Sequence, residues 1–469
     1  MELLQKHRRA FVRLAPAILG MIFVILCLFG AQHSVTPAEA RTVFMTRFDF
    51  GQVWEIAGEQ GEGPLYYWLA KIWAHFFGHA DYVLRVFSAL TGAVTIMFAF
   101  LWLKYKYGLR VAVISASLMC ISPLFVHFGQ SAEAMTLVLL LTFAANYFLQ
   151  LAIDHGNRAW WVLYAILMIM GWWTSPLFIL ILIAHVVYMW RVGGKDLLTR
   201  KEFGPTVFMI VACGALSIIH FRRMLVMSTE ADLYNSLSNA ALYMSGAVPT
   251  LIALVVGAAI AYGAYKYRLK LLSYIAVATW LGALLLPWQD LNKMPFLAVV
   301  PALLVGVIAV KMNTNYAVKG LVTFGMVTLC IVGLVSLFNN YDRDINTGEY
   351  FAARRIISHA LDLGAGEKLA IITDNEEMYF ELATYTSAEH PVLFVGVVTE
   401  KAIELDYAGR VSDFVAWRER HQNFWQVLAD DAKVPSYEGW RINETSSFAP
   451  GDGQISYRLV RFTKEEVAQ

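Results

Sequence analysis

Charged residues are scarce in this sequence. Only 16% of its 469 residues are charged and 58% are hydrophobic. In soluble globular proteins about 25% of the residues are charged and about 45 to 50% are apolar. The 37 basic and 36 acidic residues give a net charge of +1. This balance lacks the clustered basic excess that is typical of nucleic-acid-binding proteins. The composition therefore excludes nucleic acid as the default partner and predicts that most of the chain faces lipid.

Cysteine is also rare, and its placement excludes two kinds of site. The four cysteines, Cys27, Cys120, Cys213 and Cys330, are far apart in the sequence, and each lies in an apolar run. Their spacing matches neither a zinc site nor a disulfide framework. We therefore expect them to be core or lipid-facing residues.

Long apolar runs dominate the first two thirds of the chain. A helix needs about 20 mainly apolar residues to cross a bilayer. Eleven candidate spans meet this requirement, a count accurate to about two: residues 14–31, 83–103, 109–127, 134–153, 159–173, 176–190, 205–221, 247–265, 271–287, 294–310 and 320–338. The fifth and sixth meet at Thr174–Pro176 as either a tight hairpin or a re-entrant pair. The first follows a basic start and is interpreted as a retained helix.

The distribution of basic residues predicts the orientation in the membrane. With the N-terminus in the cytoplasm, the cytoplasmic stretches hold 17 Lys and Arg residues and the opposite loops hold 6. Basic residues favour the cytoplasmic ends of spans, so we expect residues 339–469 to lie outside. The compact loops favour a bacterial inner membrane.

The segment 339–469 has the pattern of a soluble α/β domain. Its charge is acidic, with 13 basic and 22 acidic residues, and it contains no Gly-rich phosphate loop. We expect helices near 350–363 and 375–385, a polar helical stretch around 408–430, and strands near 368–373, 391–398, 439–443 and 454–462. The predicted organisation is thus a transmembrane domain, 1–338, with large outer loops at 32–82 and 222–246, followed by an extracytoplasmic domain.

The first outer loop carries the most informative residues. Glu39 and Arg41 lie just past the first span. A helix follows over 64–77, where Tyr66, Tyr67 and four further aromatic residues predict a position at the membrane interface. His75 and His79 have the spacing of two ligands on one helix face but do not belong to an HExxH motif, so we expect no metal site there.

These segments resemble the start of the GT-C membrane glycosyltransferases, in particular the branch of protein O-mannosyltransferases and lipid A aminoarabinose transferases. The likeness rests on Glu39, the Pro-Leu-Tyr-Tyr-Trp-Leu helix start at 64–69, and the segments 77–90, 122–133 and 293–296. It implies a polytopic α-helical membrane protein with about 11 spans and a C-terminal soluble α/β domain. It also implies transfer of a sugar from a polyprenyl-phosphate donor to an acceptor on the outer face of the membrane.

The resemblance assigns roles to particular residues. A carboxylate would accept the proton of the attacking hydroxyl, and the candidates are Glu39 and Glu133. Cations would offset the charge of the departing lipid phosphate; sugar or isoprenoid contacts would come from Tyr66 and Tyr67. The candidate cations are Arg41, Arg222, Arg223 and Lys293. No cofactor is required, although some relatives hold a divalent cation, for which Glu39 and Glu133 would be the ligands.

Two positions depart from the family pattern and leave alternatives open. Ala38 stands where the family has the Asp of an Asp-Glu pair, and Gly63 stands where it commonly has a Lys. Either Glu39 then takes over the work of the Asp, or the site is altered and Glu39 merely caps or solvates the end of the first span. A degenerate, non-catalytic GT-C subunit is one alternative function. A transporter or flippase of lipid-linked sugars is another, although the sequence shows no clear internal repeat.

Overall fold

The computed structural model describes residues 2–30, 35–176, 178–198, 203–215, 353–364, 370–386, 392–395, 413–448 and 457–465, with isolated residues between 271 and 338 and at 411. The chain forms two compact units. The first comprises residues 1–31, 57–69 and 85–338, and the second comprises residues 32–56, 70–84 and 339–469. The second unit thus combines most of the first predicted loop with the C-terminal segment.

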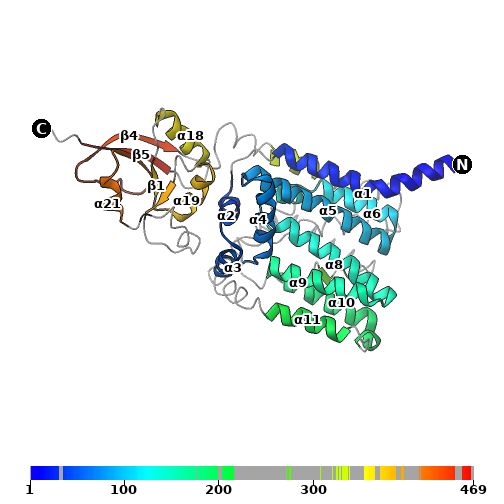
Figure 1. The fold of residues 1–469 in the computed structure, drawn as a ribbon. Helices are drawn as coiled ribbons and strands as arrows, with labels where there is room; N and C mark the ends of the chain where they lie inside the picture. The colour runs from blue at the N-terminus through cyan, green and yellow to red at the C-terminus, as the bar shows by residue number, and fades with distance from the viewer. Residues whose placement is uncertain are drawn as a thin grey trace. The chain divides into compact units, whose positions relative to one another are not determined.

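Long helices make up the first unit and lie side by side (Figure 1). They are α1 (Glu2–Gly30), α5 (Asp81–Tyr107, of which the first turn belongs to the second unit), α6 (Leu109–Cys120), α7 (Pro123–Gln130), α8 (Met135–His155), α9 (Arg158–Thr174), α10 (Phe178–Leu198) and α11 (Phe203–Ala215). Large apolar side chains such as Trp102, Trp161 and Phe125 are fully buried between them. In the described part of the chain, α5 and α8 are long and apolar enough to cross a membrane, and the pair α6 and α7 adds a third crossing if it is one span.

The third predicted span, 109–127, is broken. Helix α6 ends at Cys120, α7 begins at Pro123, and the two axes differ by 59°. Proline has no N–H and its ring clashes with the preceding turn, so it begins a helix far more readily than it continues one. The fifth and sixth predicted spans are the separate helices α9 and α10, joined by residues 175–177. The span predicted at 247–265, most of those at 271–287, 294–310 and 320–338, and the end of that at 205–221 lie outside the described residues.

Polar side chains on one face of α8 connect it to α10. Asn146, Gln150 and Asp154 are spaced four residues apart, which places them on the same side of the helix. Nε2 of His185 donates to Oδ1 of Asn146 at 2.7 Å, and the Tyr188 hydroxyl donates to Oε1 of Gln150 at 2.7 Å. Gln150 in turn donates to the Asp154 carboxylate at 2.8 Å. Buried polar groups need such partners where water is excluded, so these bonds also specify how α8 and α10 pair.

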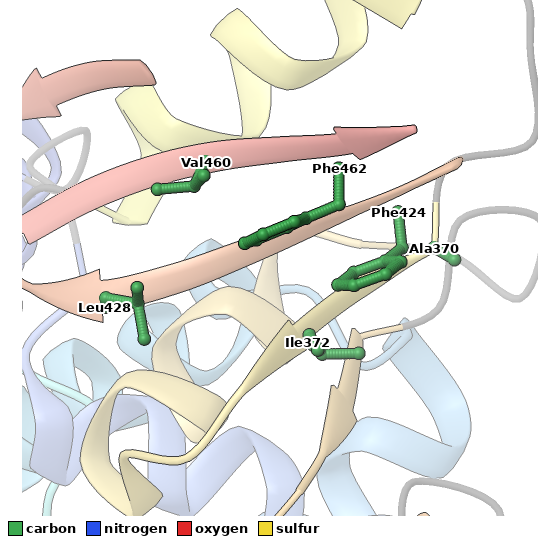
Figure 2. Packing of buried hydrophobic residues seen from close by; sticks show 6 residues of the cluster. All are labelled: Ala370, Ile372, Phe424, Leu428, Val460 and Phe462. Carbon is green, nitrogen blue, oxygen red and sulfur yellow. The ribbon is translucent and has the colours of Figure 1, made fainter. Parts of the chain in front are cut away.

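A five-stranded mixed sheet is the centre of the C-terminal part of the second unit. Its strands are β1 (Ile371–Thr373), β2 (Val392–Phe394), β3 (Asn423–Ala429), β4 (Trp440–Phe448) and β5 (Tyr457–Lys464), in the order β2-β1-β3-β5-β4. Strand β1 is parallel to both neighbours, and β5 is antiparallel to both of its own. Figure 2 shows the core of the sheet, made of Ala370, Ile372, Phe424, Leu428, Val460 and Phe462. The helices among the described residues of this part are α18 (Ala353–Gly364), α19 (Glu376–Thr384) and α21 (Phe414–Glu419).

The central strand β3 corrects one expectation. Residues 408–430 were expected to be helical, but α21 is the only helix among the described residues of that stretch, and 423–429 form the strand between β1 and β5. The five interior residues of β3 are all buried. A strand buried on both faces lacks the alternation of polar and apolar residues by which strands are recognised. The periodicity therefore gave no signal for it.

Candidate functional site

The predicted catalytic loop begins with helix α2 (Pro37–Met45), and Glu39 caps its N-terminus. The Glu39 carboxylate accepts from the Thr36 backbone N–H at 3.0 Å, and the Glu39 N–H donates to the Thr36 hydroxyl at 3.2 Å. This reciprocal pair is a capping box, which satisfies two backbone donors that a helix start leaves unpaired. Glu39 has no exposed surface, whereas its neighbour Ala38 is exposed. The capping role of Glu39 is thus observed, and its role as a base stays a prediction.

Helix α2 is held along its length by α19, which is more than 300 residues away in the sequence. The Val35 N–H, just before α2, donates to the Tyr385 hydroxyl at 2.7 Å. Just after α2, Nη2 of Arg47 donates to the Ala383 carbonyl at 3.0 Å. Between these bonds, the Phe44 ring meets the edges of two aromatic rings of α19. The C-terminal segment therefore determines where α2 and Glu39 lie within the second unit.

Arg41 lies on the same side of α2 as this contact. Its guanidinium carbon is 5.7 Å from the centre of the Phe380 ring, within the range of a cation–π interaction. The side chain is half-buried. The prediction that Arg41 offsets the charge of a phosphate remains open, and its stacking on α19 restricts where the guanidinium group can reach.

Tyr66 and Tyr67 lie in α4 (Leu65–Phe77), and both rings are buried. The Tyr67 hydroxyl donates to the Glu62 carboxylate, and the Tyr66 hydroxyl is 3.3 Å from the Ser88 hydroxyl. Glu62 is half-buried and belongs to the same unit as both tyrosines. Glu62 was not predicted to be a site residue, since its five-residue spacing from Tyr67 indicates no particular contact. The structure adds it as an acidic residue with a defined partner in this region.

Gly63 departs from the family pattern for a steric reason. A Cβ atom at this position would collide with the backbone of Trp173 and Thr174, at the end of α9. Gly63 therefore allows the chain just before α4 to pack directly against α9. A lysine, which the resemblance in the sequence led us to expect at this position, does not fit here.

Replacing Gly63 by alanine is expected to destabilise the protein. Overpacking a close backbone contact costs roughly 1 to 3 kcal/mol, and backbone atoms cannot move aside as a flexible side chain can. Thermal unfolding of the detergent-solubilised protein measures the effect. Gly204→Ala is the matched control, because a Cβ there meets nothing within 4 Å. Equal melting temperatures for the two variants would contradict the steric explanation.

Of the remaining predicted site residues, only Glu133 lies among the described residues. Glu133 is half-buried in the turn between α7 and α8, where its N–H donates to the Ser131 carbonyl at 2.9 Å. Glu133 belongs to the first unit and Glu39 to the second. Arg222, Arg223 and Lys293 lie outside the described residues, as does the predicted loop 222–246.

The described residues contain no group of three or more His, Cys, Asp or Glu side chains that could hold a metal ion. Glu39 also directs a carboxylate oxygen to the Thr36 N–H. The described side chains do not fit a divalent cation, and we derive no step through one.

Comparison with known proteins relates this geometry to a family. Residues 61–221 match the model of the dolichyl-phosphate-mannose-protein mannosyltransferase family. Comparison with curated proteins gives no match. The structure of ArnT from Cupriavidus metallidurans bound to undecaprenyl phosphate is similar with a TM-score of 0.64 at 13% identity, and the similarity covers 96% of this chain and 98% of ArnT. Its apo structure has a TM-score of 0.61 at 14% identity, covering 97% and 98%.

The two findings agree with each other. The family match begins at Gly61, just before α4, and runs through α11. The structural similarity extends over nearly the full length of both chains and so includes the C-terminal sheet. The chain therefore has the fold of ArnT, and its residues 61–221 are similar to the dolichyl-phosphate-mannose-protein mannosyltransferase family, in agreement with the resemblance in its sequence.

Proposed function

We propose that this protein transfers a sugar from a polyprenyl-phosphate-linked donor to an acceptor on the extracytoplasmic face of the membrane. The supporting observation is the similarity to ArnT over 96% of this chain and 98% of that one. Neither chain lacks a substantial part of the other, and ArnT was solved bound to undecaprenyl phosphate. A lipid phosphate is therefore the donor carrier that this fold supports best.

In the proposed reaction, the acceptor hydroxyl attacks the anomeric carbon of the sugar. Its proton passes to a carboxylate, for which Glu39 is the leading candidate and Glu133 the second. The bond between the anomeric carbon and the phosphate oxygen breaks, and the polyprenyl phosphate leaves with the electron pair. Arg41, together with Arg222, Arg223 and Lys293, would offset the charge that develops on this phosphate.

Glu39 has one property that a base at this position needs and one that limits it. Helix α2 begins seven residues after the end of α1 in the sequence, and this short separation supports a position of Glu39 near the membrane boundary. The carboxylate is buried, however, and its contact with the Thr36 N–H occupies one lone pair. A carboxylate has about four acceptor sites, so the capping bond leaves sites that can accept a proton. The acceptor hydroxyl must in addition reach the buried carboxylate.

The proposal is tested with purified wild-type protein. Labelled polyprenyl-phosphate sugars are incubated with lipid, glycan and protein acceptors, and the products are separated by mass. Enzyme-dependent transfer to one acceptor class is expected. Release of free polyprenyl phosphate without a glycosylated product, or no turnover with any class, would contradict transferase activity.

A second candidate is a non-catalytic GT-C subunit. The observation that favours it is the pair Ala38 and Glu39: the exposed position has no carboxylate, and the buried carboxylate closes a capping box. Substituting Ala38→Asp separates the two functions. If the wild type is inactive and Ala38→Asp transfers sugar, the chain is a degenerate enzyme. Transfer by the wild type excludes this candidate.

A further inference from the structure

Basic side chains gather around the C-terminal end of α2, in the second unit. Thr46 is the C-cap residue, and Nζ of Lys71 donates to its carbonyl at 3.1 Å. Nδ1 of His79 is 2.8 Å from the Thr46 hydroxyl oxygen. Arg47 follows Thr46 in the chain, and His75 lies one helical turn after Lys71 on α4. Arg47, Lys71, His75 and His79 form what we call the basic cluster.

The hydrogen bonds of Thr46 determine the orientation and tautomer of His79. The Thr46 hydroxyl donates its own proton to the Val43 carbonyl at 2.7 Å, so it can only accept from His79. The neutral imidazole therefore carries its proton on Nδ1. Nε2 is then the atom that gains a proton when the ring becomes charged, and it is a donor to an anion in that state.

The basic cluster has no acidic partner among the residues that the structure describes. Lys71 and Arg47 instead contact carbonyl oxygens and the rings of Phe50 and Phe44. Burial, followed by repulsion from Lys71, Arg47 and His75, lowers the pKa of His79 below its ordinary value. A bound anion would relieve this repulsion.

Exposed apolar side chains adjoin the basic cluster on the same segment. Phe76 is 73% exposed, Phe77 is 59% exposed and Tyr82 is 60% exposed. The segment is held in place, because the Trp73 ring nitrogen donates to the Val83 carbonyl at 2.9 Å and Gly78 ends α4 with a φ of 100°. Helix α5, which is long enough to cross a membrane, begins at Asp81. Because α5 is long and apolar enough to cross a membrane, we expect these apolar side chains to lie near the point where the chain enters it.

We propose that the basic cluster binds the phosphate of an anionic glycerophospholipid, with Phe76, Phe77 and Tyr82 in contact with its acyl region. The positive charge of the basic cluster favours an anionic ligand. The exposed aromatic side chains beside the cluster favour an anion that is carried by a lipid. This site is separate from the carboxylates proposed for sugar transfer, and it does not depend on that reaction.

Lipid binding at this site takes up a proton. At neutral pH the free protein holds His79 mainly uncharged, because its pKa is lowered. The phosphate raises that pKa, so binding becomes tighter as the pH falls toward 6. The groups that act on His79 are Lys71 and His75 on α4 and Arg47 after α2, and only the histidines titrate in this range.

Native mass spectrometry of the full-length protein in detergent tests the proposal, with phosphatidylglycerol and phosphatidylcholine as probes. We expect phosphatidylglycerol to bind at least about fivefold more tightly, since each cation near an anionic lipid surface contributes a similar factor. Lys71→Gln is expected to weaken phosphatidylglycerol binding by about that factor. His79→Gln is expected to remove the difference between pH 6 and pH 8.

The controls are Lys433→Gln and His421→Gln, which change the same residue types in the C-terminal sheet region. Phe76→Ser, which removes an exposed apolar side chain without touching the charges, is expected to weaken both lipids. Equal binding of the two lipids, or Lys71→Gln and His79→Gln variants that match their controls, would overturn the proposal. Undecaprenyl phosphate that displaces phosphatidylglycerol from the same residues would overturn the assignment to a glycerophospholipid.

Discussion

Glu39→Gln is expected to reduce sugar transfer by roughly 10² to 10⁴-fold, the usual contribution of a general base, with no loss of stability. Glutamine at this position of a capping box accepts from the Thr36 N–H as glutamate does. The substitution therefore removes the proton acceptor and keeps the helix cap. Initial rates with a saturating labelled donor, together with thermal unfolding, measure the two effects separately.

Glu39→Ala is the companion variant, because it removes both the base and the cap. It should be as inactive as Glu39→Gln and in addition less stable by about 1 kcal/mol. Glu133→Gln tests the second carboxylate in the same assay. If Glu39→Gln transfers sugar at the wild-type rate, Glu39 is only a cap, and the base must be sought among Glu133 and Glu62.

Phe44→Ala is expected to detach α2 from α19. Truncation of a buried phenylalanine costs roughly 3 to 5 kcal/mol. Phe44 is 2% exposed and lies edge-on to the rings of Tyr379 and Phe380, 5.7 Å and 5.1 Å between centroids. Hydrogen exchange should become faster in peptides covering 35–47 and 376–385, while peptides from β3 and β5 keep their protection.

Two further variants make this second prediction specific. Phe208→Ala removes the same ring from an exposed position on α11, where no such loss is expected. Tyr385→Phe removes only the hydroxyl that accepts from the Val35 N–H, with Tyr437→Phe as the matched control because its hydroxyl bonds to Gln426. Unchanged exchange in α2 for both Phe44→Ala and Tyr385→Phe would show that α19 does not hold the loop.

Local sequence patterns predicted the helices and strands whose signals are local. The apolar runs led to α1, α5, α8, α9 and α10, because a helix that faces lipid must be apolar along its whole length. The strands β4 and β5 were expected within a few residues of their observed bounds. The break at Pro123 was missed because the apolar run continues on both sides of it. The strand β3 was missed because it is buried on both faces and does not alternate.

The residues of the candidate site were also predicted only in part from the sequence. Glu39 was identified from its place after the first span, with the alternative that it caps or solvates the end of that span, whereas it caps the start of α2. That the carboxylate is buried and bonded to Thr36 followed only from the folded structure. The absence of a lysine at position 63 was interpreted as a missing phosphate contact, and the structure shows that the backbone of Trp173 and Thr174 leaves no room for such a side chain.

The sequence by itself determined the class of this protein, because composition, apolar runs and the order of short motifs are properties of the chain. Tertiary structure alone decided that α19 holds α2 and that Arg47, Lys71, His75 and His79 gather around Thr46. Val35 and Tyr385 are 350 residues apart. Contacts at such separations depend on how the whole chain folds, and no local pattern of residues encodes them.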